Sequence, residues 1–438
     1  MTSKPGRYGI EQAFALGWFR PGYWKTLANL RPTHPEVAAD GSALRFTRYP
    51  FEPATVFPAC AVEAGSVQEV NLRYPAQQVR LQGGDILFVP GAEKAALIAF
   101  VNQNDVRVEH RASVWSALLD PFLDTWEEQD SIDRQFAWFA GLGLDRASVD
   151  AWRREVADAM LAYNFGTRLW EWATLDLYDV LVAQKARLSR AAFADFYSRA
   201  IHLAALDPVS PRWKASTGND IPGVLFSVLI EWHPREKDER LNARSAKVER
   251  LGQTLAAELA SSYSEPHRRY HIVAHIEKCL DELARVWDYA IHLNEVRWAL
   301  LFHDAIYDPR RQDNEARSAD WACRVMGELE RPDDEKARVR AMILATAHAA
   351  EPRMPDEALV LDIDLSILGA DEAAFDDYDR AIRIEYSWVP EAEYRPARAR
   401  LLESFLRRTR IYHTAPFRGR EPQARANIER ALARLRVT

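Results

Sequence analysis

The chain has 438 residues, of which 48% are hydrophobic and 28% are charged, a composition typical of globular proteins. The length exceeds that of one ordinary hydrophobic core and predicts two domains, or three small ones. The formal net charge of −7, from 57 basic and 64 acidic side chains, argues against a protein that is basic overall and binds nucleic acid through that charge, although it leaves room for a local basic patch.

The sequence pattern predicts neither a signal peptide nor a membrane-spanning helix. The first residues, MTSKPGRYGIEQAF, lack the apolar core of a signal peptide, and no run of about 18 apolar residues predicts a membrane-spanning helix. The cysteines Cys60, Cys279 and Cys323 form no CxxC pair, and we interpret them as buried small hydrophobic residues in a reducing compartment. We therefore expect a cytoplasmic protein without a membrane partner.

Residues 1–206 predict a mixed α/β domain. Helical spacing from Ile10 to about Leu30 ends at the prolines of RPTHP. Short β-branched runs between Leu44 and His110, separated by Gly, Pro and Asn, predict a small sheet or partial barrel. After these runs, aromatic and aliphatic residues recur at intervals of three and four, which predicts helices. This half contains no glycine-rich phosphate loop, and its role is not predicted.

The second half has a different character. Residues 207–244 combine a Pro-, Ser- and Gly-rich stretch with the charge run HPREKDER, which predicts a linker. Residues 245–438 read as almost wholly helical. The predicted fold class is therefore α+β with two domains, of which the C-terminal one is all-α.

Histidines and carboxylates interrupt three apolar stretches of this helical half. In RRYHIVAHIEKC, His271 and His275 are four residues apart and share one face of a helix. In WALLFHDAIYD, His303 and Asp304 end an apolar helix, and Asp364 breaks the apolar run ALVLDIDLSILG. Imidazoles combined with carboxylates suit a divalent metal ion and leave room for water.

The order H…HD…D resembles the HD-domain superfamily of metal-dependent phosphohydrolases over about 245–435, through RRYHIVAHI, FHDAIYDPRRQDNEARSA, ATAHAA, LDIDLSILG and IRIEYSWV. The resemblance implies one divalent ion (Mn, Fe, Co, Ni, Zn or Mg) held by His275, His303, Asp304 and Asp364. The arrangement YHIVAH also resembles the cyclic-nucleotide phosphodiesterase branch, and this resemblance implies His271 as a proton donor to the departing oxygen and not a ligand. Asp304 is a second catalytic candidate, because it would also accept a proton from the attacking water.

The related cyclic-nucleotide phosphodiesterases carry a further histidine four residues after the HD histidine, associated with a second ion. This chain has Tyr307 at that position, so we expect one ion, with Asp308 or His348 as candidate ligands of a second. Asp362 and Asp364 diverge by about 200° on a helix, so we interpret Asp362 as orienting a ligating histidine.

Substrate contacts are predicted less directly. Asn314 begins a helix just after the segment HDAIYDPRRQD, which starts at His303 and which we call the HD loop. It resembles an asparagine of the phosphodiesterases. His348 follows an apolar helix, and Arg383, Tyr386 and Arg425 offer hydrogen-bond donors to an anionic substrate.

The predicted function is hydrolysis of a phosphomonoester or phosphodiester, with a nucleotide or another small phosphorylated metabolite as substrate. One alternative is a nucleotide-sensing module that signals through the N-terminal domain. Another is an RNA- or DNA-processing nuclease, which the acidic net charge does not favour. The oligomeric state is not predicted.

Overall fold

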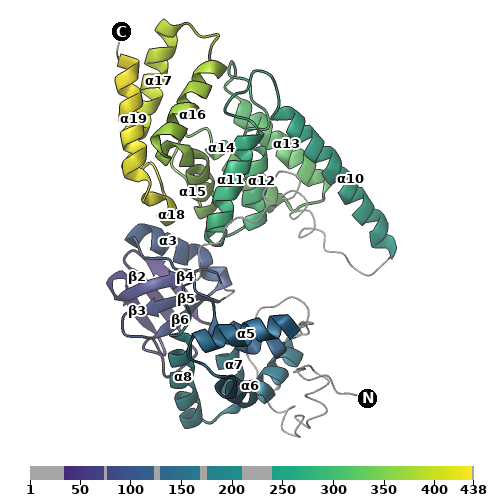
Figure 1. The fold of residues 1–438 in the computed structure, drawn as a ribbon, viewed down its shortest axis with the longest axis vertical. Helices are drawn as coiled ribbons and strands as arrows, with labels where there is room; N and C mark the ends of the chain where they lie inside the picture. The colour runs from purple at the N-terminus through teal and green to yellow at the C-terminus, as the bar shows by residue number, and fades with distance from the viewer. Residues whose placement is uncertain (1–33, 74–75, 123–128, 168–174, 210–238, 437–438) are drawn as a thin grey trace. The chain divides into compact units, whose positions relative to one another are not determined.

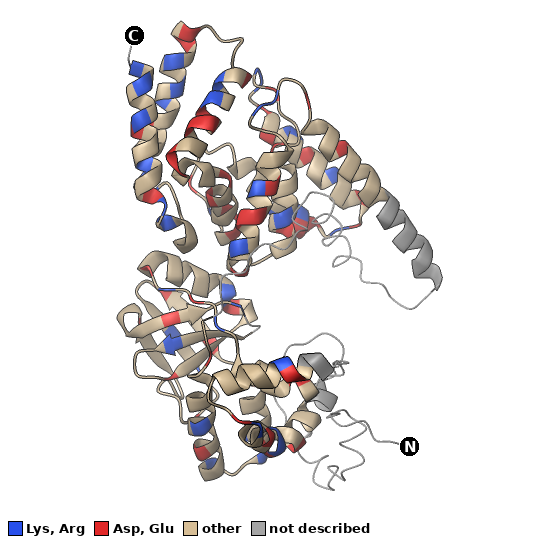
Figure 2. Ribbon diagram, in the orientation of Figure 1, with Lys and Arg blue, Asp and Glu red and all other residues tan. Residues whose placement is uncertain are grey.

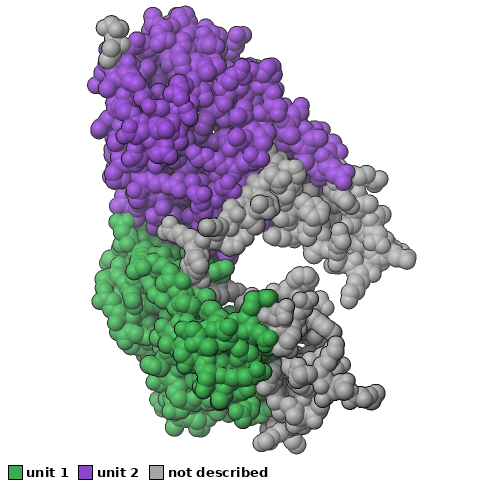
Figure 3. Space-filling model, in the orientation of Figure 1, with its two compact units in different colours: residues 1–211 green, residues 212–438 purple. Residues whose placement is uncertain are grey.

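The structure is a computed structural model that describes residues 34–73, 76–122, 129–167, 175–209 and 239–436. It divides the chain into two compact units, Met1–Pro211 (unit 1) and Arg212–Thr438 (unit 2) (Figure 3). The helix predicted between Ile10 and Leu30 lies outside the described residues, as does most of the predicted linker. Within the described ranges, no helix has both the length and the hydropathy that a membrane-spanning segment requires.

Unit 1 contains the small sheet region that the strand-like runs predicted (Figure 1). Two antiparallel sheets of three strands have the orders β1-β2-β3 and β4-β5-β6. The turn QGGD joins β5 to β6, and Gly84 within it has a φ of 89°, where side chains other than glycine are strained. The strands are β1 (Glu36–Asp40), β2 (Ala43–Arg48), β3 (Cys60–Glu63), β4 (Val67–Asn71), β5 (Ala76–Leu81) and β6 (Ile86–Pro90).

Aromatic residues join these strands to the helices of unit 1. The ring of Phe51 lies 5.8–6.1 Å from the rings of Tyr49, Phe88, Tyr178 and Phe193, and all five side chains are buried. Sheet and helices therefore share one core. The helices are α3 (Lys94–Asn104), α4 (Val114–Leu119), α5 (Gln129–Gly141), α6 (Arg146–Thr167), α7 (Leu177–Arg187) and α8 (Arg190–Ala204).

A buried polar network connects β5 to the end of α8. The guanidinium of Arg80 donates to the Asp207 carboxylate (2.6 Å) and to the Ala204 carbonyl (3.1 Å). Asp207 also accepts a hydrogen bond from the backbone N–H of Val114 (2.8 Å), the first residue of α4. The Arg80 and Asp207 side chains are only 9% and 1% exposed. Asp207, predicted as the start of the linker, is therefore an integral part of unit 1.

Burial of Asp207 makes the stability of unit 1 depend on pH. Burial raises the pKa of Asp207 to about 7, although the Arg80 charge opposes this effect. A carboxyl whose folded pKa exceeds its unfolded value of about 3.9 is destabilising above both values, and the penalty disappears as the pH falls through the folded pKa. Asp207 should therefore make unit 1 more stable at pH 5 than at pH 8 by about 2–3 kcal/mol.

Hydrogen exchange of the β5 amides in the full-length chain measures this dependence as a local opening free energy. The variant Asp207→Asn should flatten the dependence between pH 6 and 8, whereas Asp195→Asn, at a carboxylate that is 70% exposed, should not. An equal slope in Asp207→Asn and in the unmodified chain would assign the dependence to another group.

Unit 2 is helical throughout its described part (Figure 1). Helix α12 contacts α11, α13, α14 and α15, and its residues Trp298 to Phe302 are fully buried. The run WALLF is apolar on every face, so this helix requires cover on all sides. The helices are α10 (Glu239–Ser262), α11 (Val273–Val286), α12 (Leu293–Phe302), α13 (Asn314–Glu328), α14 (Asp333–Ala345), α15 (Pro355–Asp364), α16 (Glu372–Glu385), α17 (Glu391–Leu406), α18 (Ala415–Arg418) and α19 (Glu421–Arg436).

Ion pairs connect α16 to α17 and α19, and Figure 2 shows the acidic residues of α16 and the basic residues of α19. Asp376 binds Arg430 and Arg434, each at 2.9 Å, and Asp379 binds Arg398 of α17 at 3.0 Å. The α19 pairs are partly exposed, so each contributes at most about 1 kcal/mol. They orient the helices more than they stabilise them.

The expectation that all three cysteines are buried is wrong for Cys60. Cys279 is buried and Cys323 is half-buried, but Cys60 is exposed. Cys60 is the first residue of β3, which pairs only with β2 in the described part of its sheet and buries one of its four residues. None of the three cysteines forms a disulfide.

Candidate metal centre

Helix ends bring the predicted ligands together. His275 lies in the first turn of α11, His303 caps the C-terminus of α12, and Asp364 is the last residue of α15. Asp304 follows His303 directly. Because the C-terminal run WALLF of α12 is apolar on all sides and fully buried, this helix ends inside the helical unit, and α11 and α15 both contact it.

Four side-chain atoms converge there on one small volume. The Nε2 atom of His275 lies 3.2 Å from Nε2 of His303, 3.3 Å from Oδ1 of Asp364 and 3.6 Å from Oδ2 of Asp304. The Nε2 atom of His303 lies 3.0 Å from Oδ2 of Asp304 and 3.6 Å from Oδ1 of Asp364. The histidine side chains are 1–2% exposed and the carboxylates 15–16%, so solvent reaches the cluster from the carboxylate side.

These separations fit a shared divalent ion. Ligand atoms about 2.1 Å from an ion lie about 3.0 Å apart at a right angle and about 3.4 Å apart in a tetrahedron. Three of the five separations (3.0, 3.2 and 3.3 Å) lie within this range, and the other two, both 3.6 Å, exceed it by 0.2 Å. Two imidazole nitrogens with two carboxylate oxygens form a donor set that suits Mn, Fe, Co, Ni or Zn.

A backbone carbonyl fixes the tautomer of His303. Its Nδ1 atom lies 3.0 Å from the carbonyl oxygen of Leu300, one turn earlier. A carbonyl only accepts hydrogen bonds, so Nδ1 carries a proton, and in the neutral ring Nε2 presents its lone pair to the cluster. Such a contact from the second ring nitrogen is the usual way to orient a ligating histidine.

Burial and charge set the protonation of the cluster. Burial lowers the pKa of His275 and keeps its imidazole neutral. Burial also acts to lower the pKa of His303, but the charges of Asp304 and Asp364 outweigh it and raise that pKa. Against the effect of burial, the histidines hold the pKa of both carboxyls below the ordinary value. The two carboxylates therefore stay ionised, and a proton on His303 or a cation offsets their charge.

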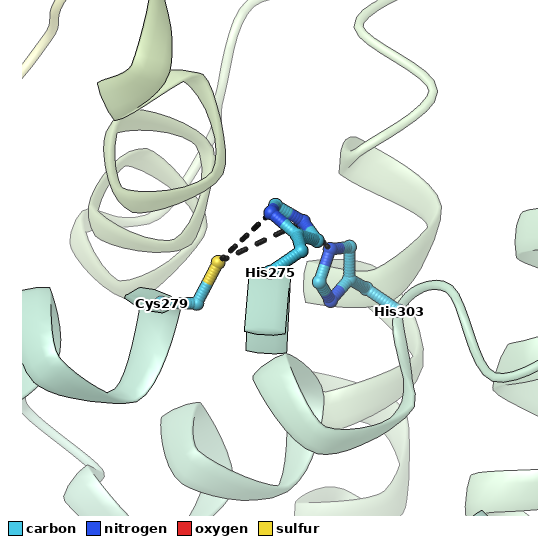
Figure 4. Close-up of side chains that lie close together, drawn as sticks. All are labelled: His275, Cys279 and His303. Atoms are coloured by element: carbon cyan, nitrogen blue, oxygen red, sulfur yellow. Dashed lines mark hydrogen bonds between the residues drawn. The ribbon is translucent and has the colours of Figure 1, made fainter. Parts of the chain in front are cut away.

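Cys279 is a further candidate ligand that the sequence reading treated as apolar packing. Figure 4 shows its sulfur beside His275 and His303, and the three residues are close enough to share an ion. The sulfur lies 3.8 Å from both ring nitrogens of His275, so it is not directed at the Nε2 lone pair. Burial raises the pKa of the thiol, which disfavours the thiolate that binds metals. The carboxylates Asp304 and Asp364 are therefore the better third and fourth ligands.

His271 forms a second element of the site. Its Nδ1 atom lies 2.7 Å from Oε2 of Glu385, whose side chain is fully buried. The Tyr307 hydroxyl donates to the same oxygen (2.8 Å), and the Tyr307 ring packs against the His271 ring with centroids 4.2 Å apart. Backbone N–H groups of Arg269, Tyr270 and His271 donate to the other oxygen, Oε1, at 2.7–3.1 Å. Glu385 therefore fixes His271 in both backbone and ring.

These contacts determine the charges of the pair. Burial acts to raise the pKa of Glu385, but the hydrogen bonds from His271 and from the backbone outweigh it and hold the pKa at about 2. Burial acts to lower the pKa of His271, but the charge of Asp304 and the hydrogen bond to Glu385 outweigh it and raise that pKa. Glu385 is a carboxylate near neutral pH, and the Nδ1 of His271 is the donor in their hydrogen bond.

Arg268 holds the His271 loop against the HD loop. Its guanidinium donates to the backbone carbonyls of His271 (3.1 Å), Asp304 (2.7 Å) and Ala305 (3.1 Å), and its Nε donates to Glu265 (3.0 Å). The Arg268 side chain is 0% exposed. A buried guanidinium requires such acceptors, and here they come from both loops that carry site residues.

His348 lies beside Asp364, with its Nε2 atom 3.1 Å from the second carboxylate oxygen, Oδ2. Its φ of 54° is a left-handed backbone conformation that costs about 1 kcal/mol or more for a non-glycine residue. Arg408 donates to the His348 carbonyl (2.8 Å) and supports this conformation. The structure therefore brings His348 to the edge of the cluster.

The other predicted substrate contacts are engaged in structural interactions. Asn314 exchanges two hydrogen bonds with the backbone of Asp308 and closes the HD loop. Arg383 binds Glu391 and the Tyr386 carbonyl at the turn after α16, and Arg425 binds Glu421 and three backbone carbonyls. The side chain of Tyr386 interacts with Tyr307, beside Glu385. No described contact brings Arg383 or Arg425 to the cluster.

The two remaining residues that were predicted to serve the cluster, Asp362 and Asp308, also form hydrogen bonds elsewhere. Asp362 is fully buried and accepts hydrogen bonds from the backbone of His413 and from the backbone and hydroxyl of Thr414, so it orients a loop and not a ligating histidine. Asp308 accepts a hydrogen bond from the backbone N–H of Arg310 (2.9 Å). No described contact joins Asp308 to the four converging side chains.

Sequence reasoning missed Glu385 and Arg268. Glu385 stands in IRIEY between the two residues that were selected there, Arg383 and Tyr386. A usable signal existed, because Glu385 follows Phe375 and Ile382 on the buried face of α16, and a carboxylate on an apolar face requires a partner.

Comparison with family models, with curated proteins and with solved structures found no match for this chain.

Proposed function

We propose that unit 2 is a metal-dependent phosphohydrolase of the HD type that acts on a nucleotide or another small phosphorylated metabolite in the cytoplasm. The convergence of His275, His303, Asp304 and Asp364 carries this proposal, because four donors from three segments lie 3.0–3.6 Å apart in five pairs. The order of these residues along the chain, which resembles the HD pattern, supports it.

The chemistry follows from the positions of the side chains. When bound, a divalent ion supplies Lewis-acid activation of water and of a phosphoryl oxygen. Asp304 is partly exposed and accepts a proton from the attacking water. His271, held through Nδ1 by Glu385, directs its Nε2–H to the departing oxygen. No covalent intermediate with the protein is required.

Metal analysis of the purified full-length chain, paired with a hydrolysis screen, tests the proposal. The screen covers nucleotides, phosphomonoesters and phosphodiesters with Mn, Mg, Co and Ni supplied. We expect about one ion per chain and turnover that disappears on chelation and returns with the ion. Bound metal without turnover on any phosphoester, or a chain that retains no metal, would contradict the proposal.

Glu385 acts as a positioning residue in this scheme. The variant Glu385→Gln keeps the volume but replaces the carboxylate that accepts the Nδ1–H of His271. We expect kcat to fall about 10- to 100-fold while KM changes little, because the ring loses its orientation only for the proton transfer. Metal content, measured in the same preparation, should stay at the level of the unmodified chain.

Glu357→Gln is the matched control, because Glu357 is also a buried carboxylate that accepts a backbone N–H, from Arg353 at 2.7 Å. Its kcat should stay within about threefold of the unmodified value. A Glu385→Gln variant with unaltered kcat would show that the His271–Glu385 contact has no part in turnover.

A further inference from the structure

A cavity of about 640 Å³ lies in unit 2 next to the His271–Glu385 pair. Its volume is in the range of small-molecule sites. Tyr307 and Glu385 line it, but His271 and the four proposed metal ligands are not among its lining residues. The cavity is therefore separate from the metal cluster and shares with it only the residues that hold His271.

Three arginines give the cavity a positive character. Arg269, Arg310 and Arg317 line it, and none of the three forms a salt bridge with a carboxylate in the described part of the chain. Many other arginines of unit 2 do so, for example Arg338 with Glu295 and Arg420 with Glu282.

The carboxylates that line the cavity compensate little of this charge. Glu385 is engaged by His271, and Glu265 forms a salt bridge with Arg268 at 3.0 Å. The third, Asp308, accepts only the backbone N–H of Arg310 among the described hydrogen bonds. The Arg269 guanidinium also donates to the carbonyls of Pro266 (2.8 Å) and Arg268 (2.7 Å), but neutral carbonyls leave its charge uncompensated. Three cationic side chains therefore line the cavity together with one carboxylate that forms no ion pair among the described residues, which favours an anionic ligand.

An apolar surface completes the cavity. Trp388 and Ile384 line it and are 47% and 52% exposed, although both are large hydrophobic residues. The guanidinium of Arg310 lies 5.2 Å from the centre of the Trp388 ring. An exposed indole beside a cation offers a stacking surface to a planar ring and a charge to its substituent.

We propose that this cavity binds a small organic phosphate that carries a planar ring, independently of the metal cluster. The arginines hold the phosphate, and Trp388 and Ile384 contact the ring. This inference does not rest on the proposed hydrolase activity, because none of the metal ligands takes part in it.

Calorimetric titration of the full-length chain with phenylphosphonate, in the presence of EDTA, tests the proposal. Phenylphosphonate carries both a planar ring and a negatively charged phosphonate, and it has no ester bond that could be hydrolysed. EDTA keeps the chain free of metal during the titration. We expect one site per chain and, because methylphosphonate lacks the ring, at least about fivefold weaker binding of methylphosphonate. Absence of phenylphosphonate binding, or equal affinity for both probes, would overturn the proposal.

Variants of exposed residues locate the binding without threatening the fold. Arg317→Gln and Trp388→Ala should each weaken phenylphosphonate binding about five- to tenfold. Arg324→Gln is the matched control, an exposed arginine on the same helix, α13, outside the cavity. Asp304→Ala should bind as the unmodified chain does.

Two outcomes of these titrations would contradict the assignment. Unchanged affinity in both Arg317→Gln and Trp388→Ala would place the probe elsewhere. Loss of binding in Asp304→Ala would place it at the metal cluster. Because the chain is free of metal throughout, failure of the hydrolysis screen leaves this proposal intact, and failure of the titration leaves the hydrolase proposal intact.

Discussion

Replacing His303 or Asp304 by alanine should remove both the bound metal ion and phosphoester turnover. Each residue supplies one of four donors, and Asp304 also supplies one of the two negative charges that attract a cation. We expect metal content to fall from about one ion per chain to a trace, and kcat/KM to fall at least about 10³-fold. Elemental analysis and turnover on the best substrate of the screen measure the two effects in one preparation.

Two control variants make this result specific. His202→Ala removes an exposed histidine of unit 1 and should leave both quantities unchanged. Cys279→Ala removes the sulfur beside His275 and should also retain the ion, because the carboxylates are the better ligands. Metal retained in His303→Ala or Asp304→Ala would contradict the ligand set, and metal lost in Cys279→Ala would add the thiolate to it.

Replacing His271 by alanine should keep the metal ion and lower the rate about 10²- to 10⁴-fold. The imidazole is held by Glu385 through Nδ1 and is no member of the converging cluster. Its proposed task is to protonate the departing oxygen, so the loss should depend on the leaving group. A 4-nitrophenyl ester, whose leaving group departs without a proton, should lose little rate, whereas an alkyl or ribosyl ester should lose most of it.

His292→Ala serves as the control, because His292 forms a similar histidine–carboxylate pair, with Asp356 at 2.9 Å, away from the cluster. It should retain the rate on both kinds of ester. Loss of metal in His271→Ala would make His271 a ligand. An equal loss of rate on both esters would remove the role of proton donor.

The parts of the site that follow from local patterns were predictable. The run WALLF has no polar face and therefore predicts a buried helix. His303 and Asp304, which stand at the end of this run, were thus expected to lie inside the unit. Helical spacing placed His275 on a helix, α11, but the expectation that His271 shares a face of that helix is wrong, because α11 begins at Val273 and His271 precedes it. The break in ALVLDIDL placed Asp364 at the end of α15. Each of these inferences needs only neighbouring residues.

The parts that depend on distant partners were not predictable in the same way. Glu385 contacts His271, which is 114 residues away in the sequence. The residues around Glu385 indicate that it needs a partner, but they do not indicate which distant residue that partner is. Arg383 and Arg425 were expected to bind an anion, but neighbouring carbonyls and carboxylates already occupy their donors. A guanidinium accepts either kind of partner, so residue type alone does not decide between them.

Unit 1 shows the same limit in its sheet. Strand β5, AQQVRL, buries Gln77, Gln78 and Arg80 together with Val79, so polar residues occupy both faces. The usual alternation of apolar and polar residues is therefore missing. The burial of Arg80 is explained by its tertiary partners far along the chain, the Asp207 carboxylate and the Ala204 carbonyl.

Arg268 has a consequence for how this site evolves. Its guanidinium forms its hydrogen bonds to the loops of His271 and Asp304 through backbone carbonyls, and every residue type carries such a carbonyl. Substitution of the side chains at these positions leaves the acceptors of Arg268 in place. A descendant of this chain that exchanged a metal ligand would keep the spacing of the two loops. New chemistry would then arise on an inherited frame, without a new fold.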